Sequence, residues 1–134
     1  MTPQQVELVK SSWIQVIPFA DTAADLFYTK LFELDGSLRP LFPADLSEQR
    51  KKLMATLGRV VASLDNLAGV VPAVQALGKK HVGYGAKPEH YATVGSALLA
   101  TLAAGLGPAF TPEVEGAWTV AYGTLSGVMI EAGR

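Results

Sequence analysis

The sequence predicts an all-α domain, because apolar residues recur at helical spacing in six successive segments and no pair of strands is left over. The β-branched runs Val60-Val61 and Val70-Val71 are short, lie inside or beside helical patterns, and lack hairpin turns around them. A chain of 134 residues can bury a sizeable core, so one domain over residues 1–134 is expected.

The first helix is expected to start at Thr2-Pro3, where a capping hydroxyl precedes a proline whose missing N–H does no harm. Its apolar face is predicted to hold Val6, Val9, Trp13 and Ile17. Pro18 interrupts this pattern. A second helix should run from about Asp21 to Asp35-Gly36, with helical spacing of Ala24, Phe27, Tyr28, Leu31 and Phe32.

Two prolines then flank apolar residues in the segment 38–43, which predicts an irregular corner that turns Leu41 and Phe42 inward. A third helix is expected after Ser47, with an apolar face made of Leu53, Leu57, Val60, Val61 and Leu64. The chain should turn between Asn66 and Pro72 and enter a helix that ends at Gly83 or Gly85, since glycine tolerates the left-handed conformation that closes helices.

Two further helices complete the prediction. Pro88-Glu89 opens the first, whose inward side is expected to hold Tyr91, Val94, Leu98 and Leu102. Thr111-Pro112-Glu113 repeats the cap-and-proline start, and the last helix should continue almost to Arg134 through Ala117, Trp118, Ala121, Leu125 and Val128.

The composition narrows the classes of function. Hydrophobic residues make up 49% of the chain and the mean hydropathy is +0.26, yet no apolar run of the ~18–20 residues that span a membrane is expected. Eleven basic and twelve acidic residues give a net charge of −1, which offers no general attraction for nucleic acid. The N-terminus lacks the pattern of a secretory signal, which favours a cytoplasmic location.

His81 is a candidate metal ligand, because it shares a helical stripe with Val70, Val74, Leu77 and Tyr84. A buried imidazole needs a partner for its lone pair or its N–H. From this helix alone, a core histidine bonded to a backbone carbonyl is the favoured hypothesis, with metal ligation as the alternative.

Gln49 and Tyr28 also lie on apolar faces of their helices. Taken singly, each is more often a solvated amide or a core phenol. Together with His81, however, they place three polar groups on the inward faces of three helices. Convergent polar groups in an apolar surrounding are typical of a small-ligand or cofactor site.

Five ordered sequence blocks resemble a globin, most closely a bacterial single-domain haemoglobin of the Vitreoscilla or methanotroph type. These blocks are Leu26-Phe-Tyr28-x-x-Leu-Phe32, Arg39-Pro-Leu-Phe42, Gln49-x-x-x-Leu53-Met54, Lys80-His81 followed by His90-Tyr91-x-x-Val94-Gly95, and Ala117-Trp118-x-x-Ala121-Tyr122-Gly123. The resemblance implies a globin fold packed around a b-type haem. Because the chain has no cysteine, such a haem would be held without a covalent bond.

The resemblance implies a role for each matched residue. His81 would be the axial ligand of the iron, with Tyr28, Gln49 and Leu53 on the distal side. Residues expected to contact the haem are Phe42, Leu53, Leu77, Lys80, His81, Tyr84, His90, Tyr91 and Val94. His90 is the alternative candidate for the iron ligand. Its position near a helix start instead predicts that it lies at the edge of the haem and contacts a propionate. In redox-active relatives a glutamate completes a set with the histidine and tyrosine; here that position falls near Gly133, and Glu131 lies two residues early.

Four functions follow as hypotheses. The leading one is reversible O₂ binding at high affinity for storage, delivery or scavenging, with CO and NO as further ligands. The second is NO dioxygenation to nitrate, for which 134 residues leave no room for flavin and nicotinamide domains, so a separate reductase is expected. A gas sensor and a haem-free globin are the others. We assign no catalytic residue, and a monomer or weak homodimer is expected.

Overall fold

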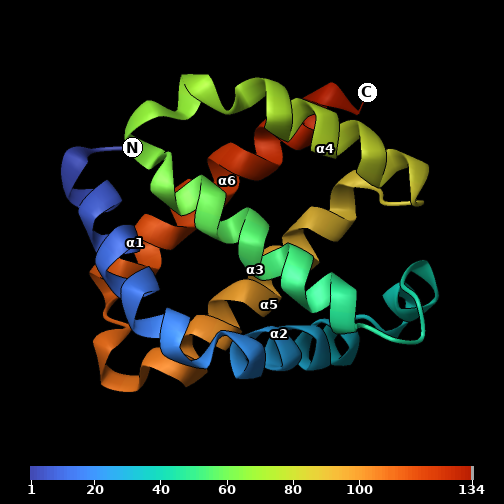
Figure 1. Cartoon of the computed structure of the whole chain (residues 1–134), viewed down its shortest axis with the longest axis horizontal. Helices are drawn as coiled ribbons and strands as arrows, with labels where there is room; N and C mark the ends of the chain where they lie inside the picture. The colour runs from blue at the N-terminus through green and yellow to red at the C-terminus, as the bar shows by residue number, and fades with distance from the viewer. Residues whose placement is uncertain (134) are drawn as a thin grey trace.

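The computed structural model describes residues 1–133, and within them the predicted all-α class is confirmed, with no strand (Figure 1). In chain order the elements are α1 (Pro3–Val16), η1 (Ile17–Phe19), α2 (Ala20–Leu34), η2 (Gly36–Leu41), α3 (Ser47–Ala62), η3 (Leu64–Gly69), α4 (Val71–Gly83), α5 (Pro88–Leu106), η4 (Gly107–Ala109) and α6 (Pro112–Ala132). The η elements are short 3₁₀ turns.

The helix boundaries follow local signals in the sequence. Thr2 caps α1 by accepting a hydrogen bond from the Gln5 N–H at 3.1 Å, and Thr111 caps α6 by accepting one from the Val114 N–H at 3.3 Å. In each case a proline follows directly. Beyond α4, Gly85 has a φ of +90°, a conformation that favours glycine. These predicted starts and this predicted stop are therefore confirmed.

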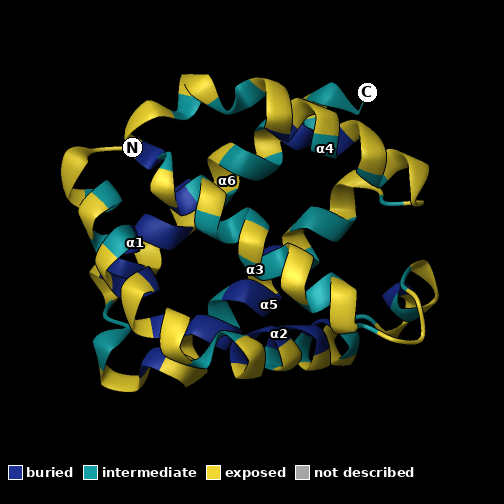
Figure 2. Ribbon diagram, viewed as in Figure 1, coloured by how far each residue is buried: buried dark blue, intermediate teal, exposed yellow. Residues whose placement is uncertain are grey.

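Most of the buried surface lies on α1, α2, α5 and α6, whereas α3 and α4 have few fully buried residues (Figure 2). Trp118 on α6 packs beside Trp13 and donates its indole N–H to the Ser12 hydroxyl at 2.8 Å, which satisfies both buried polar groups. The core thus rests on four helices, and the apolar faces of α3 and α4 are only half-covered.

Two predicted core positions are wrong. Ile17 is 53% exposed and Val16 is buried in its place, because Ile17 belongs to a 3₁₀ turn whose tighter winding rotates it off the α1 face. Leu41 is 38% exposed and Leu38 is buried instead. A Cβ added at Gly85 would meet the Leu41 side chain at 3.3 Å, so Leu41 packs against the α4–α5 connection rather than the core.

One glycine brings α4 directly onto α6. A Cβ added at Gly78 would lie 2.4 Å from the carbonyl oxygen of Met129, which leaves no room for any side chain. Apart from its sequence neighbour η3, α6 is the element on which α4 chiefly packs, and α3 makes few contacts with α4. The two helices that carry Gln49 and His81 are therefore held apart by their separate contacts.

The segment Pro88–Ala109, made of α5 and η4, is long and apolar enough to cross a membrane, with a mean hydropathy of 1.4. The expectation that no apolar run reaches the length of a membrane span is therefore wrong. This helix packs chiefly against α2 and also contacts α1 and α6, as the central helix of a folded domain does. These contacts bury 33% of its apolar window.

We predict that Gly78→Ala lowers the free energy of unfolding by about 1–3 kcal/mol, because the new methyl group collides with backbone and α4 must shift. Urea denaturation followed by circular dichroism measures this change.

Gly123→Ala is the matched control, since Gly123 is also helical but an added Cβ meets nothing within 4 Å. Alanine there should be neutral or stabilising by up to about 1 kcal/mol. Equal stabilities of the two variants would contradict the close approach at Gly78.

Candidate functional site

His81 lies half-buried in the last turn of α4, and one of its two ring nitrogens is already committed. Its Nδ1 is 2.7 Å from the carbonyl oxygen of Leu77. Because a carbonyl can only accept, Nδ1 must donate the hydrogen, and a neutral ring then keeps its lone pair on Nε2. Among residues 1–133 the ring has no other hydrogen-bond partner. The hypothesis of a carbonyl-bonded histidine is right for Nδ1, and this bond prepares Nε2 to act as a ligand.

His81 does not belong to a cluster of metal-binding side chains. Among residues 1–133, no three His, Cys, Asp or Glu side chains gather closely enough to hold a metal ion. A metal at this position would therefore need a prosthetic group to supply its other ligands.

Tyr91 lies beside the imidazole, with 6.3 Å between the ring centroids. Its position is set from α6: the Tyr122 hydroxyl donates to the backbone carbonyl of Tyr91 at 2.6 Å, and the Tyr122 ring packs on Gly95. Burial raises the pKa of both phenols, so both remain neutral at physiological pH. The sequence did not predict a role for Tyr122, because only the folded contact reveals it.

Tyr84 was predicted to continue the buried stripe of His81, and this is wrong. Its side chain is 63% exposed, although its ring centroid lies 6.0 Å from that of His81. Since α4 ends at Gly83, Tyr84 has left the helical path that the spacing assumed.

A second group of site residues is formed by three aromatic side chains, Tyr28, Phe32 and Phe42, which we call the aromatic corner. The ring centroid of Tyr28 lies 6.1 Å from Phe32 and 5.6 Å from Phe42, and the latter two are 5.6 Å apart. Tyr28 is only 4% exposed, and Phe42 is partly buried. Phe42 makes edge contacts with both other rings, and contacts of this kind stabilise aromatic clusters. They hold the Tyr28 ring of α2 against the corner before α3.

Gln49 on α3 neighbours the Tyr28 hydroxyl. Burial raises the pKa of Tyr28, opposed by hydrogen bonding with the Gln49 side chain and by the positive charge of Arg50. The phenol therefore stays protonated at neutral pH and can donate. The structure thus brings together the two polar groups that the sequence placed on separate helices.

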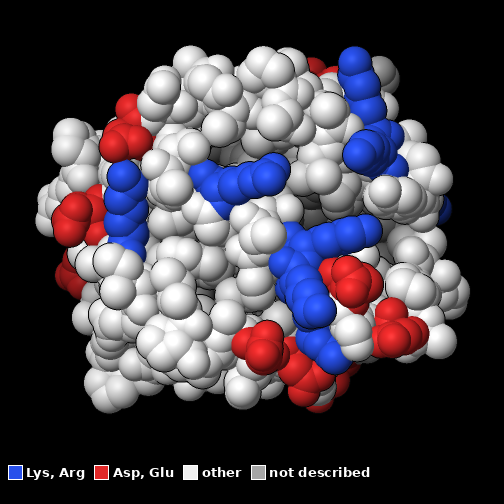
Figure 3. Space-filling view, in the orientation of Figure 1, with Lys and Arg blue, Asp and Glu red and all other residues white. Residues whose placement is uncertain are grey.

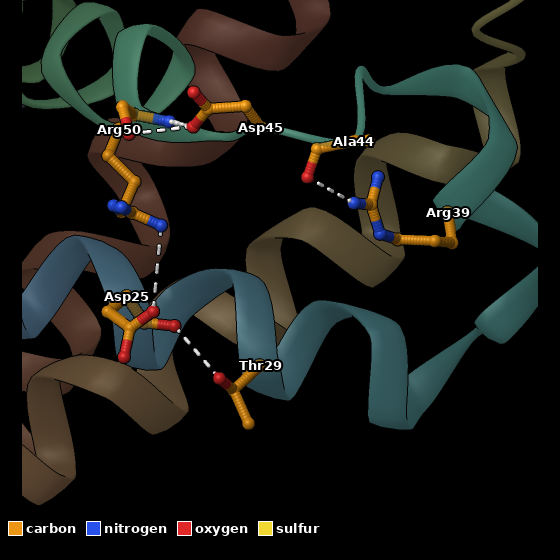
Figure 4. Close-up of polar contacts among 7 residues, drawn as sticks. Asp25, Thr29, Arg39, Ala44, Asp45 and Arg50 are labelled. Carbon is orange, nitrogen blue, oxygen red and sulfur yellow. Dashed lines mark hydrogen bonds and ion pairs between the residues drawn. The ribbon is translucent and has the colours of Figure 1, made fainter.

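Arg39 fastens the corner that positions Phe42, a role the sequence did not predict. Its guanidinium lies 5.3 Å from the Phe32 ring centroid and donates to the carbonyl oxygens of Phe42 and Pro43 at 3.3 and 2.9 Å. It also donates to the carbonyl oxygen of Ala44 at 3.0 Å (Figure 4). Planar N–H donors in a fork suit such a set of acceptors. One arginine therefore holds three successive carbonyls of an otherwise irregular loop.

A second contact joins the start of α3 to α2. The Arg50 guanidinium lies 3.7 Å from the carboxylate of Asp25, and Asp25 precedes Tyr28 by about one turn of α2 (Figure 4). Asp45 caps the same end of α3 by accepting from the Ser47 N–H at 2.9 Å and its hydroxyl at 2.7 Å. These contacts set the position of Gln49, which follows Ser47 by two residues.

The remaining predicted residues lie around these two groups. Leu53 on α3, Leu77 on α4 and Val94 on α5 are half-buried, and Lys80 is exposed. His90 accepts the Lys87 N–H on Nδ1 at 3.0 Å, so it stabilises the start of α5. At Gly133, near the position of the glutamate that the resemblance implies, an added Cβ would lie 2.6 Å from a methyl group of Val82, which would have to shift.

Two adjoining apolar hollows, of about 340 and 290 Å³ including their openings, lie between α3 and α6. The first is also lined by α4, and the second is also lined by α1 and α5. They share Val60, Ala121 and Leu125 in their linings. Neither is lined by His81, Tyr28 or Gln49, so the described structure does not place these three residues in one cavity. They form two groups on different helices: His81 offers a lone pair, and Tyr28 and Gln49 offer hydrogen-bond donors.

This arrangement fits a haem on chemical grounds. A neutral imidazole with a fixed Nδ1–H is a good ligand for haem iron, half-buried apolar side chains suit the flat macrocycle, and the absence of cysteine matches non-covalent attachment.

Comparison with known proteins points in the same direction. A family model described as Globin matches residues 25–129. A flavohemoprotein of Rhodopirellula baltica is 34% identical over 133 residues, 97% of this chain and 33% of that protein. A flavohemoprotein of Bacillus subtilis is 31% identical over 93% of this chain and 32% of its own length. The chain thus spans about a third of the length of these relatives.

Solved structures share the fold over nearly the whole chain. A bacterial globin from Campylobacter jejuni superposes with a TM-score of 0.87 at 26% identity, covering 98% of this chain and 96% of that one. An engineered carbene transferase from Rhodothermus marinus, described as a candidate nitric oxide dioxygenase, gives a TM-score of 0.89 at 25% identity, covering 99% and 93%.

Proposed function

Because the chain belongs to the globin family, we propose that it holds haem b between α3 and α4 and binds O₂ reversibly at high affinity. The observation that carries the proposal is His81, whose Nδ1 is fixed by the Leu77 carbonyl while Nε2 keeps a free lone pair. Nε2 would be the ligand of the haem iron.

When bound, haem supplies an iron with one open position at which a small diatomic gas such as O₂, CO or NO binds. Tyr28 would be the main hydrogen-bond donor to an O₂ molecule held there, because burial raises the pKa of its hydroxyl and keeps it protonated. Gln49 donates to the same ligand or to Tyr28. Leu53 and Phe42 exclude water from this side.

The other side of the haem is proposed to rest on Leu77, Tyr91 and Val94. Lys80 and His90 lie at the rim, where positive or donor groups suit the propionates. Tyr84, being exposed, would at most cover an edge.

A second candidate function is NO dioxygenation, favoured by the flavohemoprotein relatives and by the structural neighbour described as a candidate nitric oxide dioxygenase. The balanced reaction joins NO and O₂ with one electron to give nitrate, so it needs an electron donor, which we propose is a separate reductase. Rapid NO consumption that depends on the reductase would favour this function over a carrier.

We predict that the purified protein, loaded with haem, shows a Soret absorption band that shifts on reduction and on CO addition. His81→Ala should lose stably bound haem, because it removes the only proposed axial ligand. His90→Ala should retain it, at a cost in stability of about 1 kcal/mol from the lost cap. Absorption spectra after gel filtration measure retention, and the reverse result for the two variants would overturn the ligand assignment.

We also predict that Tyr28→Phe speeds O₂ dissociation about ten- to hundredfold, since a buried hydrogen bond to a charged acceptor is worth about 1.5–3 kcal/mol. Gln49→Leu should have a smaller effect. Stopped-flow displacement of O₂ by CO gives the rates. An unchanged rate in Tyr28→Phe would show that Tyr28 is not the donor.

A further inference from the structure

Positive charge is concentrated on the part of the chain that surrounds the proposed haem opening. Residues 49–88 hold seven of the eleven Lys and Arg residues and only one of the twelve acidic residues, Asp65. The rest of the chain is therefore acidic, although the net charge is only −1. Figure 3 shows basic side chains on both edges of the hollowed surface between α3 and α4.

Five of these residues form what we call the basic rim: Lys52, Arg59, Lys79, Lys80 and Lys87. All five are exposed, and none has a carboxylate partner within 4.0 Å among residues 1–133. Arg50 and Lys51, in contrast, pair with Asp25 and Glu48. The charges of the basic rim therefore form no ion pair that stabilises the fold among residues 1–133.

The helix geometry places the rim beside the opening. Lys52 and Arg59 are seven residues apart, so they share one face of α3, next to the face of Gln49 and Leu53. On α4, Lys80 lies nearly opposite Gly78, the residue pressed against α6, so it points away from that contact. Figure 3 shows basic side chains gathered on one face of the molecule, where like charges repel each other and would be stabilised by an acidic partner.

We propose that the basic rim docks a small acidic electron-transfer protein. This inference rests on the proposed haem site, because the partner would pass one electron from its reduced centre to the haem held there and would itself be oxidised by one electron. Complexes of this kind are small, polar and weak, and opposite charges speed their formation. The rim spans two helices around the site at which that electron would enter, which favours a protein of complementary shape over a nucleic acid or a flat membrane.

The test is direct binding to the haem-loaded protein. Bacterial flavodoxin, an acidic protein that carries FMN, is titrated by calorimetry at about 20 mM and about 300 mM salt, where charge screening differs strongly. We expect Kd to rise at least tenfold at the higher salt. Cytochrome c, a basic redox protein, should not bind, and binding of cytochrome c as tight as that of flavodoxin would overturn the proposal.

Matched charge variants locate the surface. Arg59→Gln with Lys79→Gln should weaken flavodoxin binding about tenfold at low salt. Lys10→Gln with Lys30→Gln removes the same charge away from the rim and should change Kd less than twofold. Equal effects of the two double variants would overturn the proposal. So would binding to phosphatidylglycerol vesicles without binding to flavodoxin, which would instead identify a membrane-binding surface.

The absorption spectrum of each sample separates the two levels of the hypothesis. If the haem-loaded sample shows no Soret band, the result contradicts the proposed function itself. If the sample retains its Soret band but does not bind flavodoxin, the result contradicts only the docking proposal. Stopped-flow reduction by reduced flavodoxin should slow in the rim variant and not in the control.

Discussion

The backbone contact between α4 and α6 at Gly78 is the constraint on which the site depends. A side chain there would meet the Met129 carbonyl, so only glycine lets the two helices approach this closely. His81 follows Gly78 by one helical turn, and the contact therefore sets where the imidazole lies. α4 packs chiefly on α6 and makes few contacts with α3, and the proposed haem site lies between α3 and α4.

The polar chemistry of the site is divided between two sides. His81 offers a lone pair, since the Leu77 carbonyl holds its only ring hydrogen. Tyr28 offers a hydrogen, since burial keeps its phenol neutral. A lone pair faces a metal and a donor faces an electron-rich ligand, so these two preferences suit opposite faces of one prosthetic group. Arg39 and Arg50 support the donor side through contacts with the corner and with α2.

The features that the sequence predicted correctly depend on interactions between residues that are close together in the chain. Thr2, Thr111 and Gly85 act through their own hydrogen bonds or backbone conformation, and each lies where expected. Ile17 and Tyr84 were misplaced because the helix ended or tightened just before them. Gly78, Arg39 and Tyr122 were missed as positioning residues for a different reason: their partners lie on other elements, and no spacing rule within one helix reveals such contacts.

The acceptor behind His81 bears on the choice between carrier and enzyme. A carboxylate that accepts the Nδ1 hydrogen makes an imidazole more electron-rich than a neutral carbonyl does, and electron donation to haem favours cleavage of the O–O bond. Here the acceptor is the Leu77 carbonyl, and Gly133, which is packed against Val82, cannot supply a carboxylate. If His81 holds haem as proposed, this side of the group would favour keeping a bound gas intact, and oxidation of NO would depend on Tyr28, Gln49 and an external electron.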